Sequence, residues 1–216
     1  MTRYVLHVLD FFAQYAKECV AGLTLLLVTL FAAYVYQEHQ VAQTQQASLA
    51  YYHLTQAENS SITDYQNFVD HQPQSVFTTF AWMKLAKMHA EKQDLSAAEH
   101  ALKQAKAHVS DSKLQDLLTL RLAKLSLVAE KPEAALDYLQ SMQGSTLAFV
   151  RDLTKIDAYI ALGKTHQAQA LIEALTQTDT ADQQPTSQQD FALKQMLASK
   201  QQQLEKTRLD TSTKNN

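Results

Sequence analysis

The side chains that most often catalyse reactions or bind metals are scattered along this sequence. No two of its eight histidines are four residues apart, so no pair shares one helix face as metal ligands. There is no Gly-x-Ser-x-Gly motif, and the acidic residues are distributed as on solvated helix faces. The single cysteine, Cys19, excludes an internal disulfide and a cysteine-based metal cage. We therefore expect no enzymatic activity, no metal and no cofactor.

Composition narrows the class of protein further. Only 3 of the 216 residues are Gly and 3 are Pro, which excludes a glycine-rich phosphate-binding loop. The formal net charge of −3 provides no broad basic surface, so we expect no binding of nucleic acid. Few helix breakers together with abundant Ala, Leu and Gln predict an all-α protein.

An apolar segment near the N-terminus predicts a membrane anchor. Val20 to Tyr36 carries no charge and would extend about 25 Å as a helix, close to the hydrocarbon thickness of a bilayer. Large residues, Leu30 and Phe31, occupy the positions where a signal peptidase requires small ones. We therefore predict an uncleaved transmembrane anchor over 19–37, with a buried core helix as the alternative.

Basic residues predict the orientation of the anchor. Arg3 and Lys17 precede it, and the next basic residue after it is Lys84. Because basic residues next to a span stay in the cytoplasm, residues 1–18 should be cytoplasmic and the C-terminal domain periplasmic, at a bacterial inner membrane. The stretch 3–16 could form an amphipathic helix on the membrane surface or a helical extension of the anchor, and both interpretations stay open.

The part of the chain that follows the anchor is predicted to form short helices joined by tight loops, and such helices pack as antiparallel hairpins. Pro132 suits the first turn of a helix. Gly144 and Gly163 follow apolar-periodic runs, where the residue after a helix adopts a left-handed backbone. The predicted helices are 42–58, 62–71, 75–91, 95–109, 112–129, 132–142, 147–162, 165–177 and 187–208.

A recurring pattern of large and small residues resembles the tetratricopeptide repeat. The first copy is Trp82, Leu85, Ala86, His89, Ala98, Leu102 and Ala105. The second is Thr119, Leu122, Ala123, Ser126, Ala135, Leu139 and Met142. A weaker third copy is Ile156, Tyr159, Ala168, Ile172 and Leu175, with Lys155 where a leucine is expected.

In this pattern, small residues let paired helices approach closely and large ones fill the remaining gaps. The predicted fold is one transmembrane helix followed by an α-solenoid of about three to four tetratricopeptide-like hairpins. An ordinary alanine-rich bundle is the alternative. The predicted domains are a cytoplasmic segment 1–18, the anchor 19–37, the repeat domain 38–178, and a polar loop, capping helix and frayed end over 179–216.

The first helix of each stacked hairpin lines a concave face, which is the candidate binding site. An apolar floor could hold an extended or amphipathic peptide, and the cations could pair with carboxylates. The asparagines that a C-terminal carboxylate clamp needs are missing from these helices. Core packing is the alternative for Leu120 and Leu127. The candidate partner-binding residues are Phe80, Met83, Lys84, Lys87, Leu120, Arg121, Lys124, Leu127, Leu153 and Ile160.

Two stretches of the sequence resemble the YfgM family. They are HQVAQTQQASLAYYHL, after the anchor, and LTLRLAKLSLVAEKPEAALDYL, in the second repeat. The resemblance covers nearly the whole chain. It implies an ancillary subunit of the SecYEG translocon in the inner membrane of Gram-negative bacteria. It also implies work with the periplasmic chaperone PpiD on unfolded secretory polypeptides, and a link to the Rcs envelope-stress response.

Three functional hypotheses follow. The first is an interaction protein at the translocon, which assists the trafficking of secretory or outer-membrane proteins. The second is a regulator of envelope stress in which the segment from Arg3 to Lys17 binds a cytoplasmic response regulator. The third is an enzyme or an enzyme-bound subunit, such as a cell-envelope scaffold for a cell-wall enzyme.

Overall fold

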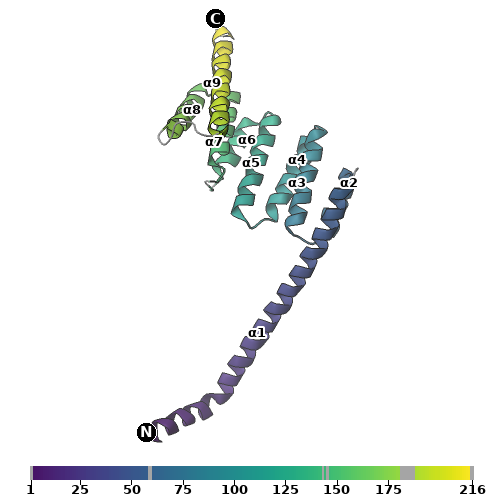
Figure 1. Ribbon diagram of the computed structural model, residues 1–216, viewed down its shortest axis with the longest axis vertical. Coiled ribbons are helices and arrows are strands. Elements are labelled where there is room, and N and C mark those ends of the chain that lie inside the picture. Colours follow the sequence, from purple (N-terminus) through teal and green to yellow (C-terminus); the bar gives the residue numbers. More distant parts are fainter. Residues whose placement is uncertain (1, 58–59, 143, 145, 181–187, 215–216) are drawn as a thin grey trace. The chain divides into compact units, whose positions relative to one another are not determined.

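The computed structural model describes the backbone of residues 2–57, 60–142, 144, 146–180 and 188–214. Side chains of 2–19, 39–40, 43, 178–180, 188–194, 208 and 210–214 lie outside that description. The chain divides into two compact units, Met1–Gln56 and Ala57–Asn216. Within the described residues the only regular elements are α-helices, which confirms the predicted all-α class (Figure 1).

The first unit is a single helix, α1 (Thr2–Gln56). Its stretch Val20–Glu38 is long and apolar enough to cross a membrane, and none of it is buried within the protein. The separate helix expected over 42–58 is instead the C-terminal part of α1. No Gly or Pro occurs between residues 23 and 56, so nothing in the sequence interrupts the helix. The stretch 3–16 belongs to the same helix.

The helices of the second unit begin where the sequence predicts, to within one residue. They are α2 (Ile62–His71), α3 (Val76–Glu91), α4 (Leu95–Ala107), α5 (Ser112–Val128), α6 (Pro132–Gln140), α7 (Ala148–Ala161), α8 (Thr165–Thr180) and α9 (Gln188–Lys214). The ends of α8 and α9 differ most from expectation. Helix α9 continues to Lys214, through residues predicted to be frayed.

Local capping explains why the helix starts are predictable. Ser61 and Asp64 form a reciprocal capping box at the start of α2. The side chain of Asp94 accepts a hydrogen bond from the Ala97 N–H at the start of α4, and this bond lowers the pKa of Asp94. Pro132 occupies the first turn of α6, as expected.

Three hairpins, α3/α4, α5/α6 and α7/α8, follow one another along the second unit (Figure 1). Helix α2 packs on α3 ahead of the first hairpin. At the other end, α9 contacts both helices of the third hairpin, just as α7 contacts both helices of the second. Helix α9 therefore occupies the place of the first helix of a further hairpin, and caps the array.

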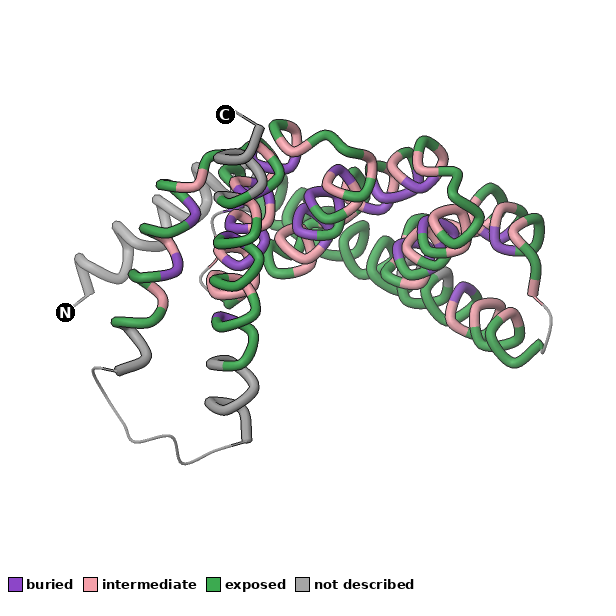
Figure 2. Tube along the Cα trace, turned by 90° about the horizontal axis from the view of Figure 1, so that it is seen from above, coloured by how far each residue is buried: buried purple, intermediate pink, exposed green. Residues whose placement is uncertain are grey.

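The predicted small positions are fully buried within these hairpins. Ala98, Ala135 and Ala168, one from each second helix, all have 0% exposure. Buried residues run along the facing sides of the helices, and exposed residues cover the outer sides (Figure 2). In the third hairpin the larger Ile156 replaces Ala86 and Ala123, and it is also fully buried.

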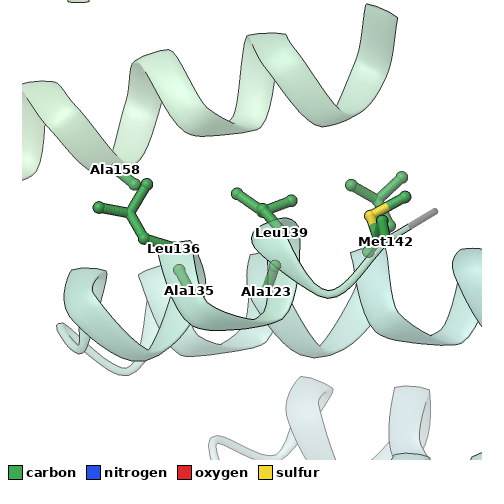
Figure 3. Close-up of a cluster of buried hydrophobic side chains, with 7 residues drawn as sticks. Ala123, Ala135, Leu136, Leu139, Met142 and Ala158 are labelled. Atoms are coloured by element: carbon green, nitrogen blue, oxygen red, sulfur yellow. The ribbon is translucent and has the colours of Figure 1, made fainter. Parts of the chain in front are cut away.

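One core cluster joins the second hairpin to the third. Leu136 and Leu139 of α6 lie between α5 and α7, and Ala158 of α7 faces Leu136 (Figure 3). Ala123 and Ala135 complete the close contact between α5 and α6. The repeats are thus stacked through a continuous apolar interior rather than joined by loops alone.

The turn within each hairpin has the same backbone geometry. Gln93, Glu130 and Gly163 adopt positive φ values of 62°, 56° and 67°. In each turn, the N–H of the following residue donates to a carbonyl five residues earlier, as in the bond from Lys131 to Ser126. These bonds define a Schellman motif, for which glycine is the preferred left-handed residue.

Only Gly163 among these three was expected to be left-handed. Gly144 meets a different requirement, because its N–H donates to Asp116 Oδ2 at 2.8 Å. A Cβ at Gly144 would lie 2.1 Å from the same oxygen. A side chain at this position would therefore displace the Asp116 carboxylate that accepts this hydrogen bond.

Replacing Glu130 by Gly should stabilise the repeat domain. A left-handed non-glycine residue costs about 1–2 kcal/mol, and the added freedom of glycine in the unfolded chain offsets only part of that gain. We expect urea unfolding, followed by circular dichroism, to show a free energy of unfolding higher by about 0.5–1 kcal/mol. The control Gly163→Ala should be less stable than the unmodified chain, and a less stable Glu130→Gly variant would contradict this account.

Candidate peptide-binding groove

A groove of about 370 Å³ opens between α3 and α5, with α4 forming its floor. Small and apolar residues dominate its lining, and its charged residues are all basic. The lining residues are Met83, Ala86, Lys87, Ala90, Ala98, Leu102, Arg121, Lys124, Leu125 and Val128.

The groove lies where the stacking of the hairpins changes, because the first and second hairpins are spaced differently from the second and third. Helix α7 approaches both α5 and α6, whereas over their described lengths no Cα atoms of α3 and α5 come within 8 Å. Ala135 follows Ala98 by 37 residues, but Ala168 follows Ala135 by only 33. Helix α4 extends nine residues beyond Ala98, while α6 extends five beyond Ala135. Helix α5 packs on α4 without reaching α3, and the space between α3 and α5 is the groove.

Basic side chains stand on both walls of the groove. On α3, Lys87 lies 3.7 Å from Glu91, and both side chains are more than 60% exposed. An exposed pair of this kind contributes little. On α5, Arg121 and Lys124 are exposed and have no ion-pair partner among the described residues. The groove therefore combines an apolar floor with positive walls.

The structure brings four of the ten predicted binding residues together in this groove: Met83, Lys87, Arg121 and Lys124. Phe80 and Lys84 are exposed on α3 outside the lining. The remaining four belong to the interior. Leu127 is half-buried against the core cluster, and the others, Leu120, Leu153 and Ile160, are buried core residues. We do not carry the interior residues forward as contacts.

Sequence reasoning missed the far end of the α5 wall. Val128 is 63% exposed and lines the groove together with Leu125. The signal was present, because Leu125 and Val128 follow Arg121 by four and seven residues, and residues so spaced share a helix face. The sequence pattern instead predicts the adjacent Leu127, which lies on the face that packs into the core.

A second, polar cavity of about 380 Å³ lies beside the α6–α7 connection. Its polar groups hold the chain in place. Asp116 accepts the Gly144 N–H, and the Gln115 amide donates to the Val109 carbonyl at 2.6 Å. Nearby, a hydrogen bond to Asp152 raises the pKa of Arg151, and the charge of Asp116 acts in the same direction. We assign this cavity a structural role.

The side chains that could carry other chemistry remain dispersed in space. Among the residues whose placement is described, no three His, Cys, Asp or Glu side chains gather as a metal site. His89, a member of the first predicted repeat copy, is partly buried, with its Nδ1 3.6 Å from Asp94 Oδ2 in the α3–α4 turn.

Comparisons with known proteins agree with the repeat architecture. Residues 10–206 match the family described as tetratricopeptide repeat-like domain. The ancillary SecYEG translocon subunit of Escherichia coli K12 is 27% identical over 173 residues, which cover 78% of this chain and 84% of that protein. The protein of the same name from Haemophilus influenzae is also 27% identical, over 85% of its length. These relatives confirm the predicted resemblance. No solved structure matches.

Substitution should separate core residues from groove residues. Leu120→Ala should lower the free energy of unfolding by about 2–5 kcal/mol, because it opens a cavity in the core cluster. Met83→Ala should cost about 1 kcal/mol or less, because this side chain is already partly in solvent. Urea unfolding of both variants checks the assignment, and equal losses would place Met83 in the core.

Proposed function

The chain belongs to the family of tetratricopeptide repeat-like domains, and on that premise we propose that it is a membrane-anchored interaction protein of the SecYEG translocon. One observation carries the proposal. The alignment with two proteins named ancillary SecYEG translocon subunit covers more than four-fifths of each of them.

The physical layout supports this role. The helix that includes Val20–Glu38 can hold the protein at a membrane. The helical repeats present a groove suited to polypeptide rather than to a reaction centre. In this proposal the protein acts by binding, without catalysis. Its partners are the translocon, unfolded secretory polypeptides and a PpiD-like periplasmic chaperone.

We further propose that the anchor lies in a bacterial inner membrane with its N-terminus in the cytoplasm. Arg3 and Lys17 on one side of the span, with no basic residue on the other before Lys84, support that orientation. The repeat domain then lies in the periplasm, where secretory chains emerge from the translocon.

The association is tested by purifying the tagged full-length chain from membranes in mild detergent and quantifying the co-purified SecY, SecE and SecG. We expect all three to be enriched about tenfold or more over an untagged membrane sample. A variant in which an unrelated span replaces Val20–Glu38 shows whether the anchor or the repeat domain makes the contact. An eluate without these subunits would refute the proposed association.

Protease added to intact spheroplasts tests the orientation. We expect it to degrade the repeat domain, since a periplasmic domain is exposed once the outer membrane is opened. A cytoplasmic marker protein should stay intact in the same sample. Protection of the repeat domain until the inner membrane is lysed would reverse the proposed orientation.

A further inference from the structure

We propose that the groove between α3 and α5 selects polypeptide segments in which one bulky apolar side chain is flanked by carboxylates. This inference rests on the proposed function, since it specifies the kind of segment that the repeat domain binds. It assigns the groove a preference in charge as well as in hydrophobicity.

Small residues account for the apolar part of the preference. Ala98 on the α4 floor and Ala86 and Ala90 on the α3 wall are small, and they leave open space between α3 and α5. The volume of about 370 Å³ lies near the lower end of the range for ligand pockets, which is roughly 300–1,000 Å³. The groove therefore has room for a large side chain and its immediate neighbours, but not for a folded element.

The apolar residues of the two walls can adapt to more than one type of peptide side chain. Met83 on α3 is flexible and polarisable, and Leu125 and Val128 on α5 supply aliphatic surface. An adaptable wall discriminates weakly between one apolar side chain and another. Discrimination between peptides must then come from the residues next to the apolar side chain of the peptide, which meet the charged residues of the groove.

The charges account for the acidic part of the preference. Lys87 lines one wall of the groove, and Arg121 and Lys124 line the other. No acidic residue in the described part of the chain lines the groove. Arg121 presents a planar guanidinium that can bind a carboxylate through two parallel hydrogen bonds. A lysine-rich segment would bring like charges together and be rejected. Carboxylates on both sides of the peptide's apolar side chain would meet cations from both walls of the groove.

Full-length protein in nanodiscs of neutral phosphatidylcholine provides the test. Three short fluorescent peptides share a central leucine and differ only in flanking residues, which are Glu, Gln or Lys. Fluorescence anisotropy should rank their affinities Glu above Gln above Lys. We expect about tenfold or more between Glu and Lys at low salt, a gap that narrows as salt screens the charges.

Charge reversal sharpens the test. The double variant R121E/K124E should invert the order, so that the Lys-flanked peptide binds more tightly than the Glu-flanked one. A variant that failed to fold would lose all binding, so it could not produce an inversion. The matched control K113E/K164E makes the same change in net charge at two exposed lysines outside the groove, and it should keep the original order.

A second pair of variants tests the apolar wall. Met83→Gln with Lys87→Gln should weaken binding of the Glu-flanked peptide about tenfold, because it removes apolar surface and a cation together. Met88→Gln with Lys92→Gln changes the same residue types at the same spacing, outside the lining, and should leave binding unchanged.

The inference is overturned if the three peptides bind equally, if none binds, or if R121E/K124E retains the original order. Competition by anionic phospholipid would reassign the groove to lipid. Cross-linking from a photoreactive residue at Val128 to a second copy of the chain would reassign it to self-association. If the protein ranks the peptides by charge but SecYEG does not co-purify with it, this inference stands and only the translocon role is refuted. If SecYEG co-purifies but no peptide binds, the translocon role stands and this inference is refuted.

Discussion

Close approach between paired helices is the constraint on which the rest of this structure depends. Three alanines, Ala98, Ala135 and Ala168, have no exposed surface, and each lies where the second helix of a hairpin meets the first. A larger side chain at these points would force the helices apart or off their preferred rotamers. Because each hairpin is narrow, leucines such as Leu139 can fill the space that remains and bury the face of the next hairpin.

A departure from that regular stacking creates the candidate site. The second and third hairpins stack closely, and α9 continues the same arrangement at the end of the array. Between the first and second hairpins the period is longer, and α5 rests on α4 without reaching α3. The gap leaves open space beside small residues such as Ala86 and Ala90, while Arg121 and Lys124 remain beside it in solvent. The scaffold follows from the repeat pattern, and the site lies where the spacing of that pattern changes.

The two units of the chain have complementary physical roles. An apolar stretch of α1 without protein cover is suited to lipid, because all its backbone hydrogen bonds are satisfied within the helix. The repeat domain is suited to polypeptide, since its groove is lined by side chains that favour contact area and charge over chemistry. In a protein of the translocon, such an anchor would raise the concentration of the groove near emerging chains, so that individually weak contacts would suffice.

The sequence by itself determined the features that depend on local interactions. The helix starts followed from local features such as the N-cap Asp94 and the first-turn Pro132. The anchor followed from uninterrupted apolar residues, and the hairpins from the spacing of small and large side chains. Only the tertiary structure decided which residues on the predicted binding face are accessible. Helical periodicity assigns a residue to a face, but its burial depends on how far away the next helix lies. For that reason Leu120 is core and Val128 lines the groove, although both lie on α5. The left-handed backbone at Gln93 and Glu130 could not be predicted for a similar reason. The packing of the paired helices imposes the turn, and neither residue type indicates a positive φ.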